Sequence, residues 1–199
     1  MISHELQFIF VHIPKTGGSS VTYHLRKYSS DPITVSNSRV GKKQGIGVDR
    51  CRPFKKHAGA ERLRRLYGNK IFRSYFKFSI VRNPYDRMLS FYCYKYQLKK
   101  GDHGKLNICA DHFAAFVAEQ RPQRSYLARH KVHLVRFENL VADLNKLEVF
   151  EGVITFDDLP VFNASANSNW DWRKTYTPEM RDVVYQRHRG DFKTFGYDK

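Results

Sequence analysis

The segment from Leu6 to Tyr28 constrains the fold of this 199-residue chain more than any other stretch. The nearly unbroken apolar run at residues 8–13 is typical of a strand that is covered on both faces of a parallel sheet. Pro14 ends this strand, and the apolar residues beyond position 20 recur at helical spacing: Val21, Leu25 and Tyr28. The segment therefore predicts a strand, a short loop and a helix, as in an α/β fold.

The loop between this strand and this helix has the composition of an anion-binding site. It consists of Lys15, Thr16, Gly17, Gly18, Ser19 and Ser20. Unpaired amides and the positive end of the helix dipole meet at a helix N-terminus, and glycines let an anion approach the backbone. Lys15 adds a mobile charge, and the serines add hydroxyl donors. We interpret the loop as a phosphate cradle, although it differs from the nucleoside-triphosphate loop GxxxxGK[ST], because its lysine precedes the glycines.

A second strand and helix repeat this arrangement. Residues 75–81 read as a strand, and Arg82 and Pro84 follow before a helix whose apolar residues share one face: Met88, Leu89, Tyr92 and Tyr96. The planar fork of an arginine can pair with two phosphate oxygens, so this junction can hold a second phosphate. The residues alone leave open a structural ion pair for Arg82 and, for Ser90, a backward hydrogen bond to a helix carbonyl.

Two motifs resemble those of sulfotransferases that use 3′-phosphoadenosine 5′-phosphosulfate (PAPS), particularly carbohydrate sulfotransferases and their bacterial relatives. HIPKTGGSS is similar to their 5′-phosphosulfate loop, and VRNPYDRMLSFY is similar to their 3′-phosphate motif. The resemblance implies a P-loop-like α/β fold with a central parallel sheet flanked by helices, and PAP as the product nucleotide. It also implies that Lys15 contacts the bridging oxygen and leaving phosphate, residues 16–20 the 5′-phosphate, and Arg82 and Ser90 the 3′-phosphate.

His57 stands between the two motifs, just before a helix predicted over 58–67. A single histidine in that position is often a surface or capping residue. Bacterial relatives in the same family carry a histidine between the two cofactor motifs, so the resemblance implies that His57 is the general base. The near-neutral pKa of a free imidazole suits proton removal from an attacking hydroxyl.

The segment at 29–56 contains several glycines and prolines, has weak periodicity and predicts a long surface connection on the acceptor side. Thirteen lysines and arginines lie between Arg39 and Lys77, against only Asp49 and Glu61. Two interpretations stay open for this charge: a solvated basic surface, or a lid that recognises an acidic acceptor.

The C-terminal half predicts further regular elements and one flap. We expect Asp111 to cap a helix that ends at Glu119, another strand within 131–137, a helix over 140–150, and a last helix capped by Thr177. Glu138 reads as structural. The polar and aromatic stretch 157–176 resembles a segment that implies a flap over the cofactor, with Trp170, Trp172 or Arg173 near its adenine or phosphate end. Core or surface packing of the tryptophans is the alternative.

Composition narrows the class of partner. Lys and Arg outnumber Asp and Glu by 35 to 19, which gives a net charge of +16 and favours an anionic partner such as a nucleotide, an acidic glycan, nucleic acid or a membrane surface. Three scattered cysteines form neither a disulfide framework nor a metal-binding pair: Cys51, Cys93 and Cys109. We see no signal-type segment and no apolar run near the roughly 20 residues that cross a bilayer, so we expect a cytoplasmic protein.

Together these features predict one domain over 1–199 that transfers the sulfuryl group of PAPS to an acceptor hydroxyl, with a carbohydrate favoured by the resemblance. We expect in-line displacement with His57 as base and no metal. Three alternatives stay open: a P-loop-type small kinase that depends on ATP and magnesium, a nonenzymatic module that binds anions or nucleic acid, and a sulfotransferase-like protein that binds PAPS without turnover. We expect no nucleic-acid partner, because basic aromatic RNA-binding motifs are absent.

Overall fold

Strand β2 (Phe8–Val11) is the centre of the fold, and none of its four residues reaches solvent in a computed structural model of the chain. The structure describes residues 1–40, 43–50, 56–96, 108–160 and 171–199, with the side chains of 36–40 and 43–50 left out. Burial on both faces is what the apolar run at 8–13 predicts, because both sides of an interior parallel strand are covered. The strand prediction is confirmed.

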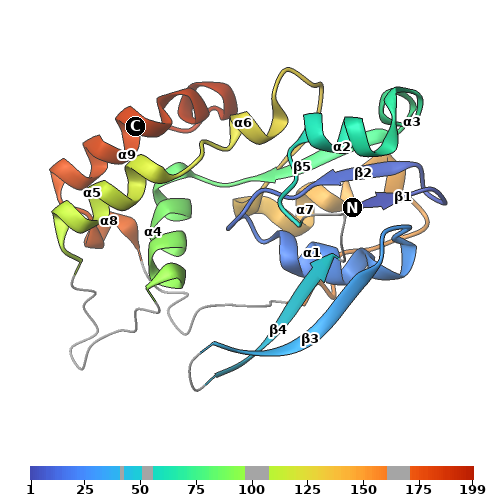
Figure 1. The fold of residues 1–199 in the computed structure, drawn as a ribbon, viewed down its shortest axis with the longest axis horizontal. Coiled ribbons are helices and arrows are strands. Elements are labelled where there is room, and N and C mark those ends of the chain that lie inside the picture. The colour runs from blue at the N-terminus through green and yellow to red at the C-terminus, as the bar shows by residue number, and fades with distance from the viewer. Residues whose placement is uncertain (41–42, 51–55, 97–107, 161–170) are drawn as a thin grey trace. The chain divides into compact units, whose positions relative to one another are not determined.

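The central sheet has the strand order β1–β2–β5–β6. β1 (Ile2–Ser3) pairs antiparallel with β2, whereas β5 (Phe76–Val81) and β6 (His133–Arg136) continue the sheet in parallel. The buried Ser79 hydroxyl donates to the Val11 carbonyl oxygen at 2.7 Å, which fixes the last rung between β2 and β5. The chain is thus a single α/β domain with a mostly parallel sheet flanked by helices, as the sequence predicts (Figure 1).

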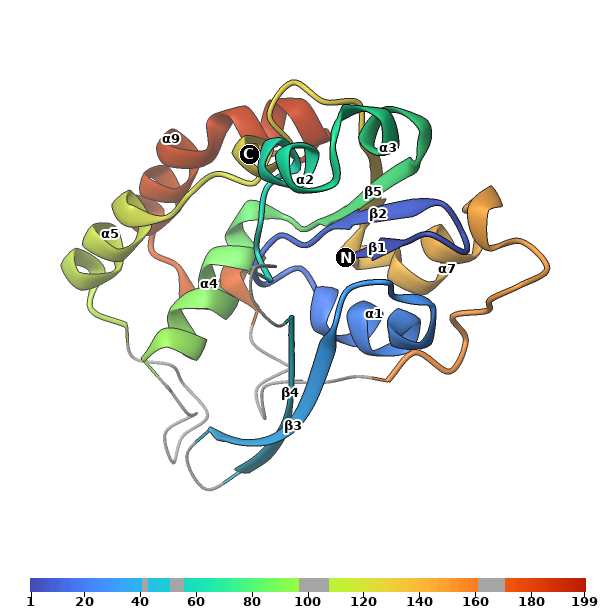
Figure 2. The ribbon, with the colours of Figure 1, turned by 45° about the vertical axis from the view of Figure 1, so that its right-hand side comes forward.

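Helices cover both faces of this sheet. α1 (Gly18–His24) lies on one side of the strands in both views, and α2 (Ala60–Tyr67) and α3 (Asn69–Ser74) lie on the other (Figures 1 and 2). The chain also forms the helix α7 (Leu140–Asn145) and the 3₁₀ turns η1 (Leu25–Tyr28), η2 (Phe137–Asn139) and η3 (Glu148–Phe150). The core beside α1 and α7 is aromatic and includes Phe8, Phe10, Phe78, Phe150 and Phe156.

A β-hairpin stands where the sequence predicts a long surface loop over 29–56. β3 (Ile33–Val40) and β4 (Lys43–Arg50) pair antiparallel, with Ile33 opposite Arg50, and β4 runs beside α1. The loop prediction is therefore wrong for these residues. Their β-branched residues favour extended backbone, and a two-stranded ladder pairs backbone groups that an irregular segment leaves to water.

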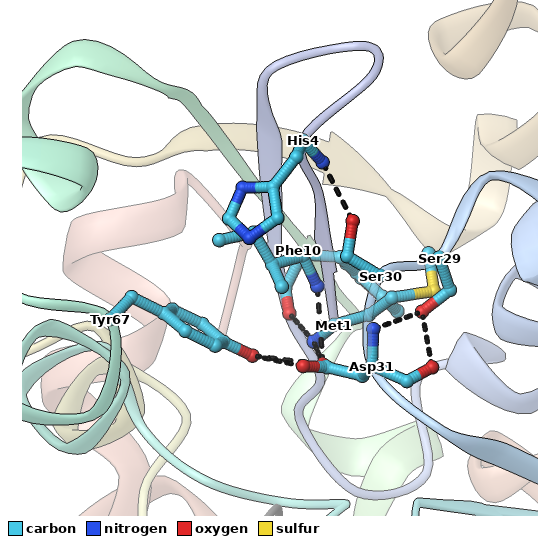
Figure 3. A network of polar contacts seen from close by, with 8 residues as sticks. Met1, His4, Phe10, Ser29, Ser30, Asp31 and Tyr67 are labelled. Carbon is cyan, nitrogen blue, oxygen red and sulfur yellow. Dashed lines mark hydrogen bonds and ion pairs between the residues drawn. The ribbon is translucent and has the colours of Figure 1, made fainter.

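The carboxylate of Asp31 joins three segments of the chain that lie close together in Figure 3. It is buried, accepts a hydrogen bond from the Ile2 amide at 3.2 Å, and accepts another from the Tyr67 hydroxyl at 2.8 Å. The amino group of Met1 lies 3.7 Å from the same carboxylate and donates to the Phe10 carbonyl oxygen at 3.0 Å. Asp31 therefore holds β1, the segment after η1 and the end of α2 in one place.

Internal contacts divide the domain into two compact units, residues 1–81 with 125–163 and residues 82–124 with 164–199. The second unit contains the helices α4 (Pro84–Lys95), α5 (Ala110–Glu119), α8 (Trp172–Thr175) and α9 (Pro178–Phe195), and α6 (Arg124–Leu127) begins at its boundary. Within the described parts of the chain, no helix has the length and apolar character needed to span a membrane.

Two predicted helix starts in the second unit have different outcomes. The Thr177 hydroxyl accepts from the Met180 amide at 3.3 Å, so Thr177 caps α9 as predicted. The expected cap at Asp111 is wrong, because α5 starts at Ala110 with Cys109 in the cap position. Asp111 instead lies in the first turn, where its negative charge interacts favourably with the positive end of the helix dipole. Its side chain makes no capping hydrogen bond.

Trp172 packs in the aromatic core of the second unit. Its ring stacks on Tyr85 at 4.3 Å between centroids, and the Tyr176 hydroxyl donates to the Tyr85 carbonyl oxygen at 3.0 Å. The sequence leaves two possibilities for Trp172, a position near the cofactor or packing within the protein, and the structure shows that it packs in the core. Trp170 and half of the expected flap, residues 161–170, lie outside the described residues, so the flap stays a prediction.

His188 makes the stability of the fold dependent on pH. Its ring is fully buried on α9, and burial lowers its pKa below the ordinary 6.5; nearby Arg87 acts in the same direction, whereas Asp191 opposes it. The unfolded chain therefore takes up this proton more readily than the folded chain. We expect the free energy of unfolding to fall, as pH drops below 6.5, by up to about 1.4 kcal/mol per pH unit.

Melting temperatures at pH 7.5 and 5.5 test this expectation in the wild type and in His188→Gln, with exposed His133→Gln as the control. The His188 variant should lose less stability between the two pH values than the wild type and the control do. Equal losses in all three proteins would exclude His188 as a source of acid sensitivity.

Candidate functional site

The loop after β2 is packed so closely that only glycine fits at two of its positions. Gly17 has a positive φ of 80°, and a Cβ atom there would lie 2.8 Å from Cε2 of Phe137. A Cβ atom on Gly18 would overlap the imidazole ring of His12. Both glycines thus rest directly on aromatic rings, and any side chain at either position would push the loop away from its support.

Lys15 and Thr16 give the loop its shape. Lys15 is half-buried and has a φ of 68°, in the left-handed region that non-glycine residues rarely occupy. Such a conformation persists at functional sites when the surrounding structure imposes it. The Thr16 hydroxyl is buried and donates to the Ile13 carbonyl oxygen at 2.9 Å. That proton is engaged within the loop, so Thr16 can offer an anion its backbone amide.

The backbone amides at the start of α1 differ in whether the helix provides them with a hydrogen-bond acceptor. The Ser20 amide donates to the Gly17 carbonyl oxygen at 3.1 Å. The amides of Gly18 and Ser19 belong to the first turn, where a helix provides no internal partner. A phosphate at this loop would therefore be bound by the amides of Gly18 and Ser19, by the Ser19 hydroxyl and by the Lys15 ammonium group.

The structure brings His57 to the same loop. Its Nδ1 lies 3.3 Å from the carbonyl oxygen of His12, three residues before Lys15. A carbonyl oxygen only accepts hydrogen bonds, so in the neutral ring Nδ1 carries the proton and Nε2 carries the basic lone pair. The His57 ring is exposed, whereas neighbouring Ala58 and Ala60 are buried. His57 is thus an accessible imidazole with a defined tautomer, attached to the start of the loop after β2.

His12 is the residue of this site that the sequence analysis did not assign. It is buried, packs parallel to Phe10 at 5.5 Å between centroids, and meets the His57 ring edge-on at 4.7 Å. Its ring also supports Gly18. A polar residue inside the apolar run 8–13 was the available signal, since buried imidazoles need a specific environment.

Three further predicted site residues belong to the second unit. Arg82 directly follows β5, is half-buried, and has both backbone polar groups bonded to the side chain of Gln123. Ser90 is half-buried within α4. Arg173 is exposed on α8, with its guanidinium carbon 4.6 Å from the ring centroid of Trp172.

Part of the predicted basic surface is neutralised by an acidic partner. Glu61 accepts from Arg64 at 2.7 Å, from Arg65 at 3.0 Å and from His130 at 3.0 Å, and these contacts, led by Arg64, lower the pKa of the Glu61 carboxyl. Exposed cations also occur on α2 and α3, at Arg62, Lys70 and Arg73. Among the residues whose placement is described, no three His, Cys, Asp or Glu side chains gather in a way that could hold a metal ion.

Comparison with known proteins identifies one match. A family model described as the sulfotransferase family matches residues 1–159. A search of curated proteins and a search of solved structures each find no match. The matched range includes the loop at 14–20, His57, Arg82 and Ser90, and it ends before Arg173.

Proposed function

Since the chain belongs to the sulfotransferase family, whose model covers residues 1–159, we propose that it transfers the sulfuryl group of PAPS to a hydroxyl group of a carbohydrate acceptor. Family membership supports sulfuryl transfer in general. The observation that carries the finer proposal is the attachment of His57 to the carbonyl oxygen of His12, directly before the loop, because it places an accessible base beside a backbone suited to bind an anion.

The loop suits the 5′-phosphosulfate end of the donor. PAPS supplies an activated sulfuryl group whose leaving group is a phosphate. Glycine at 17 and 18 lets the loop pack on the rings of Phe137 and His12, and the amides of Gly18 and Ser19 lie in the first turn of α1, where a helix provides no carbonyl partner for them. In this proposal Lys15 neutralises the charge that develops on the oxygen whose bond to sulfur breaks.

His57 acts as the general base in the proposed reaction. Its Nε2 takes the hydroxyl proton while the acceptor oxygen forms its bond to sulfur and the bond from sulfur to the 5′-phosphate oxygen breaks. The His12 carbonyl oxygen stabilises the resulting imidazolium ion, because Nδ1 then still donates to it. Positioning and charge stabilisation supply most of the catalysis, as they do in the transfer of phosphoryl groups.

Arg82 and Ser90 are assigned to the 3′-phosphate in this proposal. An arginine fork pairs with two phosphate oxygens, and a serine hydroxyl donates to a third. Arg173 is also proposed to contact the nucleotide, on weaker support, since it lies outside the range that matches the family model. Exposed Arg62, Lys70 and Arg73 support an acidic acceptor, because their charge attracts anionic groups.

Thermal unfolding in the presence of PAP tests the donor. A ligand that binds only the folded state adds about 2.7 kcal/mol of stability at one hundred times its Kd. We expect a clear rise in melting temperature with PAP, a much smaller rise in Arg82→Ala and Ser90→Ala, and little response to ATP with magnesium. A response to ATP with magnesium but none to PAP would replace the sulfotransferase proposal with the kinase alternative.

A further inference from the structure

Gln123 holds the backbone of Arg82 from both sides. Its Oε1 accepts from the Arg82 amide at 3.0 Å, and its Nε2 donates to the Arg82 carbonyl oxygen at 2.8 Å. The orientation of the side-chain amide is unambiguous, because an N–H group needs an acceptor and a carbonyl needs a donor. The Gln123 side chain thus pairs with Arg82 in the way that a neighbouring strand pairs with a residue of a sheet.

Gln123 is itself held by buried groups. No part of it reaches solvent, and its own amide donates to Asp191 Oδ2 at 2.7 Å. The next amide, that of Arg124, donates to Asp191 Oδ1 at 2.9 Å, so both oxygens of this fully buried carboxylate are used. A carboxylate with two backbone donors is a strong anchor, since hydrogen bonds to charged groups are stronger than neutral ones.

A second contact fixes the same segment from α4. Arg87 is almost fully buried, and its Nη1 donates to the Arg121 carbonyl oxygen at 3.3 Å, two residues before Gln123. The segment at 121–124 is therefore held by α9 through Asp191 and by α4 through Arg87. Gln123 passes this support on to the first residue after β5.

We propose that Gln123 is the positioning residue for Arg82, and that it sets the preference of the protein for a nucleotide that carries a 3′-phosphate. The inference rests on the proposed function, in which Arg82 binds that phosphate. A bidentate arginine contact demands a fixed orientation of the guanidinium group, which begins with a fixed backbone. Gln123 touches no reacting atom and acts only through Arg82.

The preference is measured as the ratio of two dissociation constants. AMP carries the 5′-phosphate alone and PAP carries the additional 3′-phosphate, so Kd(AMP)/Kd(PAP) reports what the 3′-phosphate contributes. Gln123→Met keeps the length of the side chain but makes neither hydrogen bond to Arg82. We expect this variant to lower the ratio at least about fivefold, through a weaker PAP complex, with Kd(AMP) within about twofold of the wild type.

Gln120→Met is the matched control. Gln120 lies directly before this segment, at the end of α5, and its side chain donates to the Phe116 carbonyl oxygen at 2.8 Å. The same substitution there should leave the ratio unchanged. Should Gln123→Met fail to fold, Gln123→Glu repeats the test, because an ionised carboxylate still accepts from the Arg82 amide but donates nothing to its carbonyl.

A double variant separates positioning from general support of the fold. In Arg82→Ala, whose ratio is already low, adding Gln123→Met should lower the ratio no further. An unchanged ratio in the single Gln123 variants, or equal losses of affinity for PAP and AMP, would overturn the positioning role. A wild-type ratio near one would instead overturn the assignment of Arg82 to the 3′-phosphate, and with it the premise of this inference.

Discussion

Replacing His57 with Asn is expected to lower kcat by about 10²- to 10⁴-fold, the usual contribution of a general base. Asn suits this test because its side-chain NH₂ group can occupy the place of Nδ1 and keep the hydrogen bond to the His12 carbonyl oxygen. What is lost is Nε2, the atom assigned to the acceptor proton. Affinity for PAP should stay within about twofold, since the lost atom is assigned to the acceptor and not to the nucleotide.

Steady-state sulfuryl transfer with PAPS, followed over a range of pH, measures this effect. The acidic limb of the wild-type profile should vanish in His57→Asn, because no imidazole remains to be protonated. His24→Asn is the matched control: its Nε2 also lies against a backbone carbonyl, that of Thr155 at 2.7 Å, but has no assigned role. A His57→Asn enzyme that keeps its rate and its acidic limb would remove His57 from the proposed chemistry.

The sequence predicts best where a pattern is local. The apolar run at 8–13 leads to a buried strand, the small residues after Pro14 lead to a loop before α1, and Thr177 with Pro178 leads to the start of α9. Each of these follows from the side chains of a few consecutive residues. The motif-bearing junctions after β2 and β5 were therefore predictable from composition and spacing.

The errors come from segments whose structure depends on other segments. The hairpin of β3 and β4 is stabilised by pairing between residues up to 17 positions apart, such as Ile33 and Arg50. A polar strand pair with several glycines has weak periodicity, so its sequence looks like that of a loop. Asp111 was a reasonable cap by residue type, but the cap is Cys109, so the helix begins two residues earlier than predicted, at Ala110.

The residues that support the site could not be predicted either, because their contacts also join segments far apart in the sequence. Gln123 contacts Arg82 across 41 positions, and Asp191 contacts Gln123 across 68. Phe137 supports Gly17 from a separate element, and only the fold brings them together. Residues that would touch a ligand stand in recognisable motifs, whereas the residues that hold them carry no pattern until the fold is known.

Replacing Lys15 with Ala is the second large effect that we expect, a fall in kcat/KM of at least about tenfold. One charge-assisted contact is commonly worth about 1.5 to 3 kcal/mol, and here it is assigned to the oxygen that leaves sulfur. Exposed Lys146→Ala is the control for loss of a positive charge in the same unit, and its rate should be unchanged, because Lys146 has no assigned role. Unchanged turnover in Lys15→Ala would exclude the lysine from the mechanism.

The backbone of Lys15 allows function to be separated from stability. Ala and Gly both remove the ammonium group, so Lys15→Ala and Lys15→Gly should lose activity to the same extent. Because residue 15 has a φ of 68°, the glycine variant avoids a steric cost of about 1 kcal/mol that alanine still pays. Lys15→Gly should therefore melt at a higher temperature than Lys15→Ala while being equally inactive. Equal melting temperatures would mean that the loop relaxes when the side chain is removed, and that the lysine itself imposes the left-handed conformation.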